Sequence, residues 1–335
     1  MAPLGRGAHQ NDMQKGESIV SIALAAIVFF AVIAIQRKWK PASLKDVASS
    51  AEDFILTTTG IRGQAPDIAG YERLKTFRLG RGYYAGQYRA TPAPLIFASG
   101  RLVVYDRQDH PVFSLETLEG SKEPWTALYD FGGRRGLSVG GSRARPDYAR
   151  DLTGDGNPDI IIGQYSGGDH CCTVATLVSL GPDAVITIGR IDGLDGLPFE
   201  GLEVRKVDKD AAWECIAHRP YVTTCGTHAD AADVVSVYTL ADGRYTDQTA
   251  RFGDYLEEVL RQNSAKWRLE KNRSLRLLQT LAIDYAAVGQ RDQGKRFFAL
   301  NLSQFLPSLQ RQNLDPNACI ESLETLVDRM PALGP

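Results

Sequence analysis

The sequence predicts an α+β protein with an apolar helix near the amino terminus, then an all-β domain, then an α-helical segment. Three patterns indicate this order. Residues 19–35 carry no charged side chain. Residues 77–250 contain short apolar or alternating runs separated by Gly, Pro and Asp, which is typical of strands and turns. From residue 253 onward, apolar residues recur every three or four positions, as they do on one face of a helix.

The composition is that of a globular protein, and 335 residues are enough for about two domains. The formal net charge is only −2, but the charges are unevenly distributed. Residues 151–250 contain 16 acidic and 6 basic side chains, whereas residues 37–100 contain 5 acidic and 10 basic ones. Because the acidic region attracts cations and repels phosphates, we expect no nucleic-acid partner.

The amino-terminal region is predicted to hold the protein at a membrane. Residues 1–17 are polar and Gly-rich and show no periodicity, so we expect a disordered tail. As a helix rising about 1.5 Å per residue, the segment 19–35 is just long enough to cross a bilayer core. We therefore expect an uncleaved single-pass transmembrane helix at 18–36, with a cleaved signal sequence as the alternative.

The charges next to the apolar segment and the features of the later residues predict different sides of the membrane for the body of the protein, which is the part that follows the predicted membrane helix. Arg37, Lys38 and Lys40 directly follow the apolar segment, and the positive-inside rule would keep the body in the cytoplasm. A calcium loop and clustered cysteines further along the chain favour the outside, where calcium is abundant and disulfides persist. We expect a periplasmic or otherwise extracytoplasmic body, and a cytoplasm-facing scaffold is the alternative.

Residues 37–76 are predicted to form a linker with a short helix, and residues 77–250 form the predicted β domain. The number and spacing of the expected strands favour an incomplete propeller or a sandwich. Strands are expected within 102–115, 125–131, 173–180, 184–191, 201–207, 212–217 and 234–240, and Asp242-Gly243 is a tight hairpin turn.

The loop 151–159 has the spacing of a calcium site. Its oxygen-bearing residues occupy alternate positions, with Gly between them, which is what calcium requires of a single loop. Position 12 of this loop is Ile162, where a helix-loop-helix calcium site needs Glu, so the loop leads into a strand. A metal-free Gly/Asp turn is the alternative. The predicted ligands are Asp151, Thr153, Asp155 and Asp159 at positions 1, 3, 5 and 9, with the Asn157 carbonyl at position 7.

These residues resemble the FG-GAP/VCBS type of calcium-loop repeat, which occurs in β-propeller blades and related extracellular β modules. Phe131 and Gly132 stand where the repeat has Phe-Gly, residues 151–159 match its acidic loop, and 160–163 match its apolar strand. The resemblance covers residues 131–165 and implies bound Ca²⁺ as the cofactor. Only one full loop is present, whereas a propeller needs several blades.

A flexible polar loop follows the predicted metal site and is a candidate ligand-binding loop, because loops carried by a rigid scaffold often bind ligands. Its candidate residues are Tyr165, Ser166, Asp169 and His170. A second Gly-rich segment, with Asp192, Asp195 and Glu200, weakly repeats the calcium pattern.

The cysteines favour a structural role. No CxxC motif occurs, which argues against zinc-ribbon, thioredoxin-like and haem-attachment sites. Cys215 and Cys225 flank a short predicted hairpin, and we expect a disulfide between them if the compartment is oxidising.

No catalytic signature is present: the chain lacks a GxSxG elbow, a P-loop, a dinucleotide fingerprint and HExxH. We therefore predict no catalytic residues and lean toward a protein that is not an enzyme. The alternative is an envelope hydrolase or metal-dependent enzyme that uses a His/Cys cluster near residue 170. The members of that cluster would come from His170, Cys171, Cys172, Cys215, His218, Cys225 and His228.

Residues 251–335 are predicted to form a helical domain. Amphipathic helices are expected from residue 255 and within 275–288, 293–305 and 317–329. One pair resembles a tetratricopeptide-type helical hairpin. A single repeat forms no solenoid, so we expect its small residues to let two helices pack closely, and binding of a protein partner, which the resemblance implies, is the alternative. The residues that carry this resemblance are Leu281, Ala282, Tyr285, Gly289, Gly294 and Phe298.

Together these patterns predict a membrane-anchored, extracytoplasmic, calcium-stabilised binding or accessory protein. Its membrane contact is one helix, and its helical segment packs on the β domain or meets a protein partner.

Overall fold

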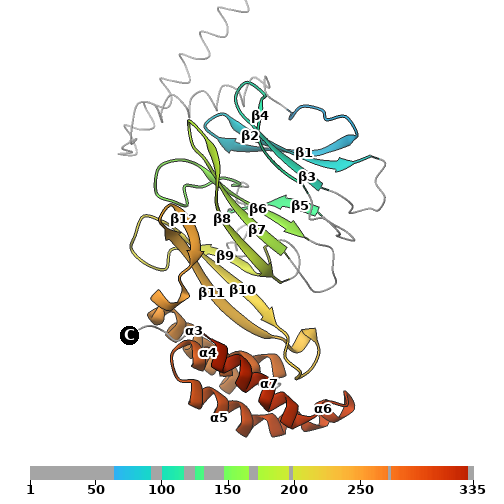
Figure 1. Ribbon diagram of the computed structural model, residues 1–335, viewed down its shortest axis with the longest axis vertical. Coiled ribbons are helices and arrows are strands. Elements are labelled where there is room, and N and C mark those ends of the chain that lie inside the picture. Colours follow the sequence, from blue (N-terminus) through green and yellow to red (C-terminus); the bar gives the residue numbers. More distant parts are fainter. Residues whose placement is uncertain are drawn as a thin grey trace, which may run out of the picture. The chain divides into compact units, whose positions relative to one another are not determined.

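The computed structural model describes residues 64–91, 100–116, 125–131, 147–165, 173–195, 199–270 and 273–330. Over these ranges the protein is α+β, as predicted, with two β sheets followed by helices (Figure 1). The chain divides into two compact units: one comprises Met1–Tyr88 and Val103–Ser114, and the other comprises Arg89–Leu102 and Leu115–Pro335.

The first sheet is a four-stranded meander of neighbouring strands. Its strands are β1 (Tyr71–Gly80), β2 (Tyr83–Ala90), β3 (Gly100–Tyr105) and β4 (Pro111–Leu115), in the order β1-β2-β3-β4. A small aromatic core includes Tyr88, whose hydroxyl lies 2.9 Å from that of Tyr105. The β region therefore begins at residue 71, earlier than the predicted residue 77.

The second sheet has eight strands and is curled (Figure 1). Its order is β5 (Trp125–Leu128), β6 (Asp159–Tyr165), β7 (Thr173–Leu180), β8 (Val185–Leu194), β12 (Arg244–Asp247), β11 (Ala232–Ala241), β10 (Glu214–Tyr221) and β9 (Leu202–Arg205). All neighbouring strands are antiparallel except β8 and β12, which run parallel. One continuous sheet therefore stands where separate blades or a sandwich were expected.

The parallel β8–β12 pair joins the two halves of this sheet, and a glycine makes it possible. Tyr245 of β12 lies opposite Gly189 of β8. A Cβ at position 189 would lie 2.6 Å from the Cβ of Tyr245, closer than real Cβ atoms approach. Gly189 thus allows Tyr245 to enter the core.

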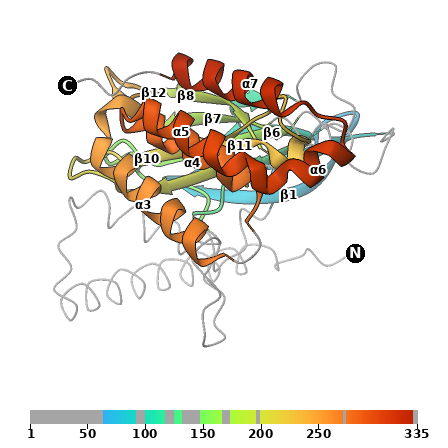
Figure 2. The same ribbon diagram turned by 90° about the horizontal axis from the view of Figure 1, so that it is seen from below.

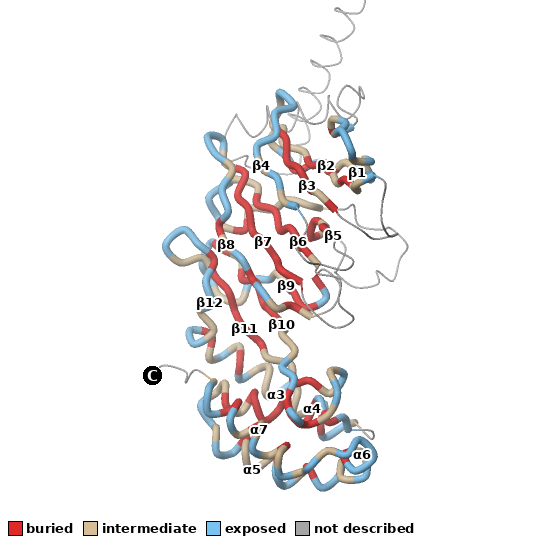
Figure 3. The backbone as a smooth tube through the Cα atoms, turned by 45° about the vertical axis from the view of Figure 1, so that its right-hand side comes forward, coloured by how far each residue is buried: buried red, intermediate tan, exposed pale blue. Residues whose placement is uncertain are grey.

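Strands β6 and β7 form the centre of the fold and are buried along almost their whole length (Figure 3). The side chains of Ile160, Ile161 and Ile162 are 0% exposed, so both faces of β6 are covered. Each such side chain contributes about 1.5–3 kcal/mol by leaving water. This agrees with the prediction of a buried strand directly after the acidic loop.

Five helices follow the sheet: α3 (Gly253–Leu269), α4 (Leu275–Ala287), α5 (Arg291–Leu302), α6 (Leu306–Arg311) and α7 (Pro316–Arg329). Two of these helices begin with a side-chain cap. The Ser274 side chain caps α4 by accepting from the Leu277 N–H at 3.1 Å, and Asp315 with Pro316 begins α7.

Helix α4 connects the helices to the sheet. It contacts β11 and also α3, α5 and α7 (Figure 2). The Thr280 hydroxyl accepts from the Asp233 N–H at 3.0 Å, which ties α4 to β11. The helices therefore belong to the same compact unit as the eight-stranded sheet.

The small residues of the helical hairpin allow close packing, as expected. A Cβ on Gly294 of α5 would lie 2.4 Å from the Ala282 carbonyl oxygen of α4, so only glycine permits this approach. Gly289 ends the preceding turn with a φ of 80°.

Several predictions concern residues outside the described ranges. These are the tail 1–17, the membrane helix at 18–36 and residues 37–63 of the linker. Within the ranges that are described, no helix is both long and apolar enough to span a bilayer.

Candidate metal centre

The predicted calcium loop is closed at its base and turned by two glycines. Arg150 and Asp159 exchange backbone hydrogen bonds of 2.9 and 2.8 Å, and this bridge marks the ends of the loop. Gly154 and Gly156 have φ values of 79° and 84°, which other residues adopt at a cost. The two glycines therefore provide the tight turns that the alternating Asp and Gly residues of the sequence indicated.

The carboxylates of this loop turn inward and hold its backbone. Asp151 accepts from the N–H groups of Gly154 (2.7 Å) and Gly156 (2.9 Å). Asp155 accepts from the Asn157 N–H at 2.7 Å. Each carboxylate oxygen has two lone pairs, so an oxygen that accepts one N–H can also ligate a cation.

Three of the five predicted ligands meet around Thr153. Its hydroxyl lies 3.3 Å from Asp159 Oδ2 and 3.5 Å from Asp151 Oδ1. Asp155 instead binds the Asn157 side-chain amide at 2.9 Å. Among the described residues, only one group of three acidic side chains has an oxygen from each within 4.8 Å of the others, and it lies elsewhere. The carboxylates of Asp151, Asp155 and Asp159 are therefore not all that close to one another.

Asp159 is the most buried of these ligands. Its side chain is 0% exposed, and Oδ2 accepts from the N–H groups of Leu152 (2.8 Å) and Thr153 (3.0 Å). The other oxygen, Oδ1, has no hydrogen-bond partner. Burial raises the pKa of Asp159, while the nearby Ser179 hydroxyl and the two N–H groups lower it. A buried carboxylate with an unpaired oxygen is costly unless a cation or a proton neutralises it.

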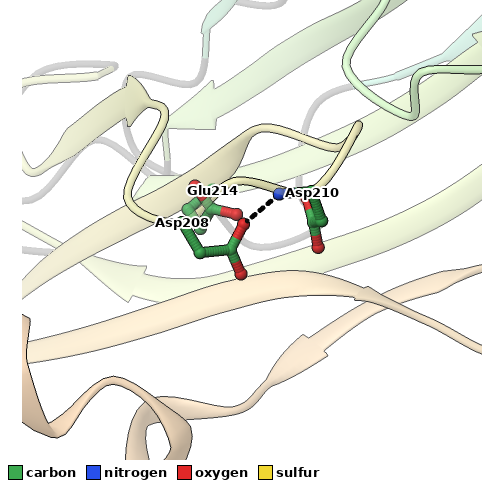
Figure 4. A group of neighbouring side chains, drawn as sticks. All are labelled: Asp208, Asp210 and Glu214. Carbon is green, nitrogen blue, oxygen red and sulfur yellow. Dashed lines mark hydrogen bonds between the residues drawn. The ribbon is translucent and has the colours of Figure 1, made fainter.

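A second acidic loop, residues 206–214, contains the trio Asp208, Asp210 and Glu214 (Figure 4). One oxygen from each of the three carboxylates can be chosen so that all lie within 4.8 Å of one another. The Asp210 N–H donates to Asp208 Oδ1 at 2.9 Å, and the Val207 N–H donates to Glu214 Oε2 at 2.6 Å. This trio was not predicted, because Asp208 and Asp210 resemble ordinary turn residues and the sequence does not reveal that Glu214 is buried.

The two acidic loops pack against each other. The Trp213 N–H donates to the Leu152 carbonyl at 2.8 Å. The Tyr245 hydroxyl lies 2.8 Å from the Leu152 carbonyl oxygen and 2.9 Å from that of Trp213. Gly154 approaches Ala211 so closely that a Cβ at 154 would lie 2.5 Å from the Ala211 Cβ. Tyr245 thus supports both loops from within the core.

The remaining predicted ligands are dispersed. Tyr165 ends β6, whereas Ser166, Asp169 and His170 lie outside the described residues. Asp192 pairs with Arg190 at 2.9 Å, and Asp195 lies 3.3 Å from His228. The weak second repeat of the calcium pattern therefore forms no cluster.

Two of its residues, Asp195 and Glu200, line a cavity of about 380 Å³ instead. The other lining residues are Gly201, His218, Pro220, Asp233 and Arg276. His218 Nδ1 lies 2.9 Å from Asp233 Oδ2, and this contact raises the pKa of His218 while burial lowers it.

The predicted disulfide between Cys215 and Cys225 is not formed, and both cysteines are free. The expected hairpin between them is absent, because β10 continues to Tyr221 and its partner β11 begins only at Ala232. Cys215 lies in the core of the sheet, whereas Cys225 lies in the helical core with Cys319.

The His/Cys cluster of the enzyme hypothesis is likewise not assembled in the part of the chain that the structure describes. His218 and His228 each contact a separate carboxylate. His170, Cys171 and Cys172 lie outside the described residues.

No family model matches the chain, and neither the curated proteins nor the solved structures contain a significant match to it. The resemblance to a calcium-loop repeat therefore rests on residues 131–165 alone.

Proposed function

We propose that this protein is a membrane-anchored, extracytoplasmic binding or accessory protein whose eight-stranded sheet is stabilised by Ca²⁺ at the loop 151–159. The observation that carries the proposal is the fully buried Asp159 carboxylate, which keeps one oxygen without a partner. A cation beside this oxygen would offset the cost of burying the charge.

The donor chemistry of the loop favours calcium. Its ligand atoms are carboxylate, hydroxyl and carbonyl oxygens, which suit a hard cation, and the loop offers neither His nor Cys. Calcium tolerates irregular coordination and six to eight ligands, whereas magnesium demands near-octahedral geometry.

A stabilising role follows from where the loop lies. It leads directly into the central strand β6, and its Leu152 carbonyl accepts from Trp213 and Tyr245, which belong to the other half of the sheet. An ion that binds only the folded loop therefore stabilises the contact between the two halves. At a hundredfold excess over Kd, such binding contributes about 2.7 kcal/mol.

Anchoring and a binding role rest on sequence and surface features. The uncharged segment 19–35 supports one membrane contact. Large apolar side chains are exposed on α3 and α5, where Leu269 is 82% and Leu300 is 78% exposed. They lie outside the acidic loops and support contact with a protein partner.

Chelation tests the proposal. EDTA lowers the melting temperature of the full-length protein in detergent, and calcium restores it whereas zinc does not. A rise of about 2.7 kcal/mol corresponds to roughly 5–10 °C for a unit of this size. Equal melting temperatures with EDTA and with calcium would refute the proposal.

A hydrolytic enzyme is the second candidate, because His218 is held by Asp233 at the wall of the 380 Å³ cavity. A His positioned by a carboxylate is suited to act as a general base. The discriminating result would be turnover of an ester or amide substrate that His218→Gln abolishes and Arg190→Gln leaves unchanged.

A further inference from the structure

We propose that Asp208, Asp210 and Glu214 form a second divalent-cation site, separate from the loop 151–159, that binds Ca²⁺. The proposal does not depend on the first site, because the two sets of ligands share no residue. It starts from the gathering of three carboxylates within 4.8 Å of one another on one short loop (Figure 4).

An acidic cluster alone indicates little, but Glu214 adds an independent observation. Its side chain is 0% exposed, and its Oε1 atom has no hydrogen-bond partner. Its other oxygen is fixed by the Val207 N–H at 2.6 Å. A buried, oriented and half-satisfied carboxylate thus faces the two Asp side chains. Burial raises the pKa of Glu214, and the negative charges of Asp208 and Asp210 raise it further.

Two basic side chains near this loop are engaged elsewhere, and Lys209, between Asp208 and Asp210, is exposed. The Lys206 ammonium donates to the backbone carbonyls of Asp210, Ala211 and Ala212. Arg205 lies 3.4 Å from Glu203. Among the described residues, no ion pair reaches any of the three carboxylates.

Arg150, on the neighbouring loop, is also occupied. It pairs with Asp147 at 2.8 Å, and its guanidinium lies 5.1 Å from the Trp213 ring centre. Neither Arg150 nor the two basic side chains described above pairs with Glu214, which leaves this carboxylate open to a cation from solution.

The ligands select the type of cation. Three carboxylates without His or Cys favour a hard ion. Oxygens on opposite sides of Ca²⁺ are about 4.6–5.2 Å apart, but about 4.0–4.2 Å apart around Mg²⁺. Three carboxylate oxygens that all lie within 4.8 Å of one another are therefore close enough to ligate one Ca²⁺. Asp210 is exposed and Asp208 is half-buried, so water can complete the coordination and the ion can exchange.

Binding at this site would stiffen the connection between β9 and β10. Trp213 immediately precedes Glu214, and its backbone N–H and carbonyl are hydrogen-bonded to Leu152 and Tyr245, respectively. An ion held by Glu214 therefore stabilises the contact between the two acidic loops. Trp213 also lies close enough to sensitise the luminescence of a terbium ion bound there.

Terbium, which substitutes for calcium, provides the test. The full-length protein in detergent is titrated with Tb³⁺ under tryptophan excitation, and Ca²⁺ is then added as a competitor. We expect sensitised emission that Ca²⁺ displaces, with Asp208→Asn/Asp210→Asn weakening Tb³⁺ binding at least tenfold. These two residues are not buried, so Asn should preserve the fold, which circular dichroism verifies. Glu257→Gln/Glu321→Gln removes the same charge from exposed helical positions and should change nothing.

A further variant separates this site from the proposed calcium loop. Asp151→Asn should keep the emission attributed to Trp213, and Trp213→Phe should remove most of it. Wild-type emission and affinity in Asp208→Asn/Asp210→Asn would overturn the second site, whatever happens at the loop 151–159. Emission that is lost in Asp151→Asn but kept in Asp208→Asn/Asp210→Asn would assign the bound ion to the first loop instead, and would also overturn it.

Discussion

The hydroxyl of Tyr245 lies 2.8 Å from the carbonyl oxygen of Leu152, although 93 residues separate them in the chain. This contact places a buried tyrosine beneath both acidic loops and at the junction of the two halves of the sheet. Burial raises the pKa of Tyr245, so the hydroxyl stays protonated and remains a donor.

Tyr245→Phe should destabilise the protein by about 1–2 kcal/mol, because the one phenolic O–H that the Leu152 and Trp213 carbonyls share is lost. The Leu152 carbonyl keeps its bond from the Trp213 N–H, which limits the loss. Denaturant unfolding in EDTA measures the change. Tyr221→Phe is the matched control, since Tyr221 is 40% exposed and should tolerate the change. An unchanged midpoint in Tyr245→Phe would show that this hydroxyl does not support the loops.

The stability of the helical region should depend on pH through Asp284. Its side chain is 5% exposed and accepts from the Asn263 amide at 2.7 Å. Burial raises the pKa of Asp284 from 3.8 to about 7, and the Asn263 hydrogen bond opposes this rise. The folded protein therefore prefers the protonated carboxyl, whereas the unfolded chain ionises near pH 4.

Because of this difference, stability falls as the pH rises from about 4 to about 7, by on the order of 4 kcal/mol from this group. Asp284→Asn removes this dependence and should stabilise the protein at pH 8 while changing little at pH 4. The measurement is denaturant unfolding at both pH values, with the exposed Asp183→Asn as control. A loss of stability at pH 8 in Asp284→Asn would contradict the account.

Oxidation should join Cys225 to Cys319 and leave Cys215 reduced. Cys225 and Cys319 share the helical core and interact through their thiols, whereas Cys215 is buried in the sheet. Burial raises the pKa of both thiols, so the reaction with oxidised glutathione will be slow. Peptide mapping without reductant identifies the bond. A Cys215–Cys225 peptide would contradict the placement of these two cysteines in separate cores and would favour the sequence prediction.

The position of the body relative to the membrane can be tested directly. A reporter that is active only outside the cytoplasm should be active when it is fused after residue 330, beyond α7. A reporter that is active only in the cytoplasm should be inactive at the same position. By the positive-inside rule, Arg37, Lys38 and Lys40 favour a cytoplasmic location for the residues that follow them. Replacing all three with Gln should therefore increase the fraction of molecules in which these residues lie outside the cytoplasm. Reporter activity confined to the cytoplasm would favour the scaffold alternative.

Local patterns predicted much of the fold, because each depends on residues close together in the chain. The isoleucine run 160–162 forms a buried strand, and the helix expected at 275–288 is found at Leu275–Ala287. The acidic loop has the turns that its glycines indicated.

Features that depend on distant residues were missed. The continuous sheet requires Tyr245 to meet Gly189, and no local pattern encodes that pair. The structure does not form the predicted Cys215–Cys225 disulfide, because β10 runs on past the expected turn. The trio around Glu214 was not predicted, because its importance depends on the burial of one carboxylate. The acid-rich composition of residues 151–250 was the one available signal.

The central claim is that a cation neutralises the buried carboxylate of Asp159, and thermal unfolding of Asp159→Asn tests it most directly. Asn keeps the size of Asp159 and an oxygen for the Leu152 and Thr153 N–H groups, but lacks the charge. In EDTA, Asp159→Asn should melt at or above the wild-type temperature, because a buried charge is removed. With calcium added, the wild type and Asp183→Asn should rise by several degrees and Asp159→Asn by much less. An equal rise in Asp159→Asn, or no rise in the wild type, would contradict the account.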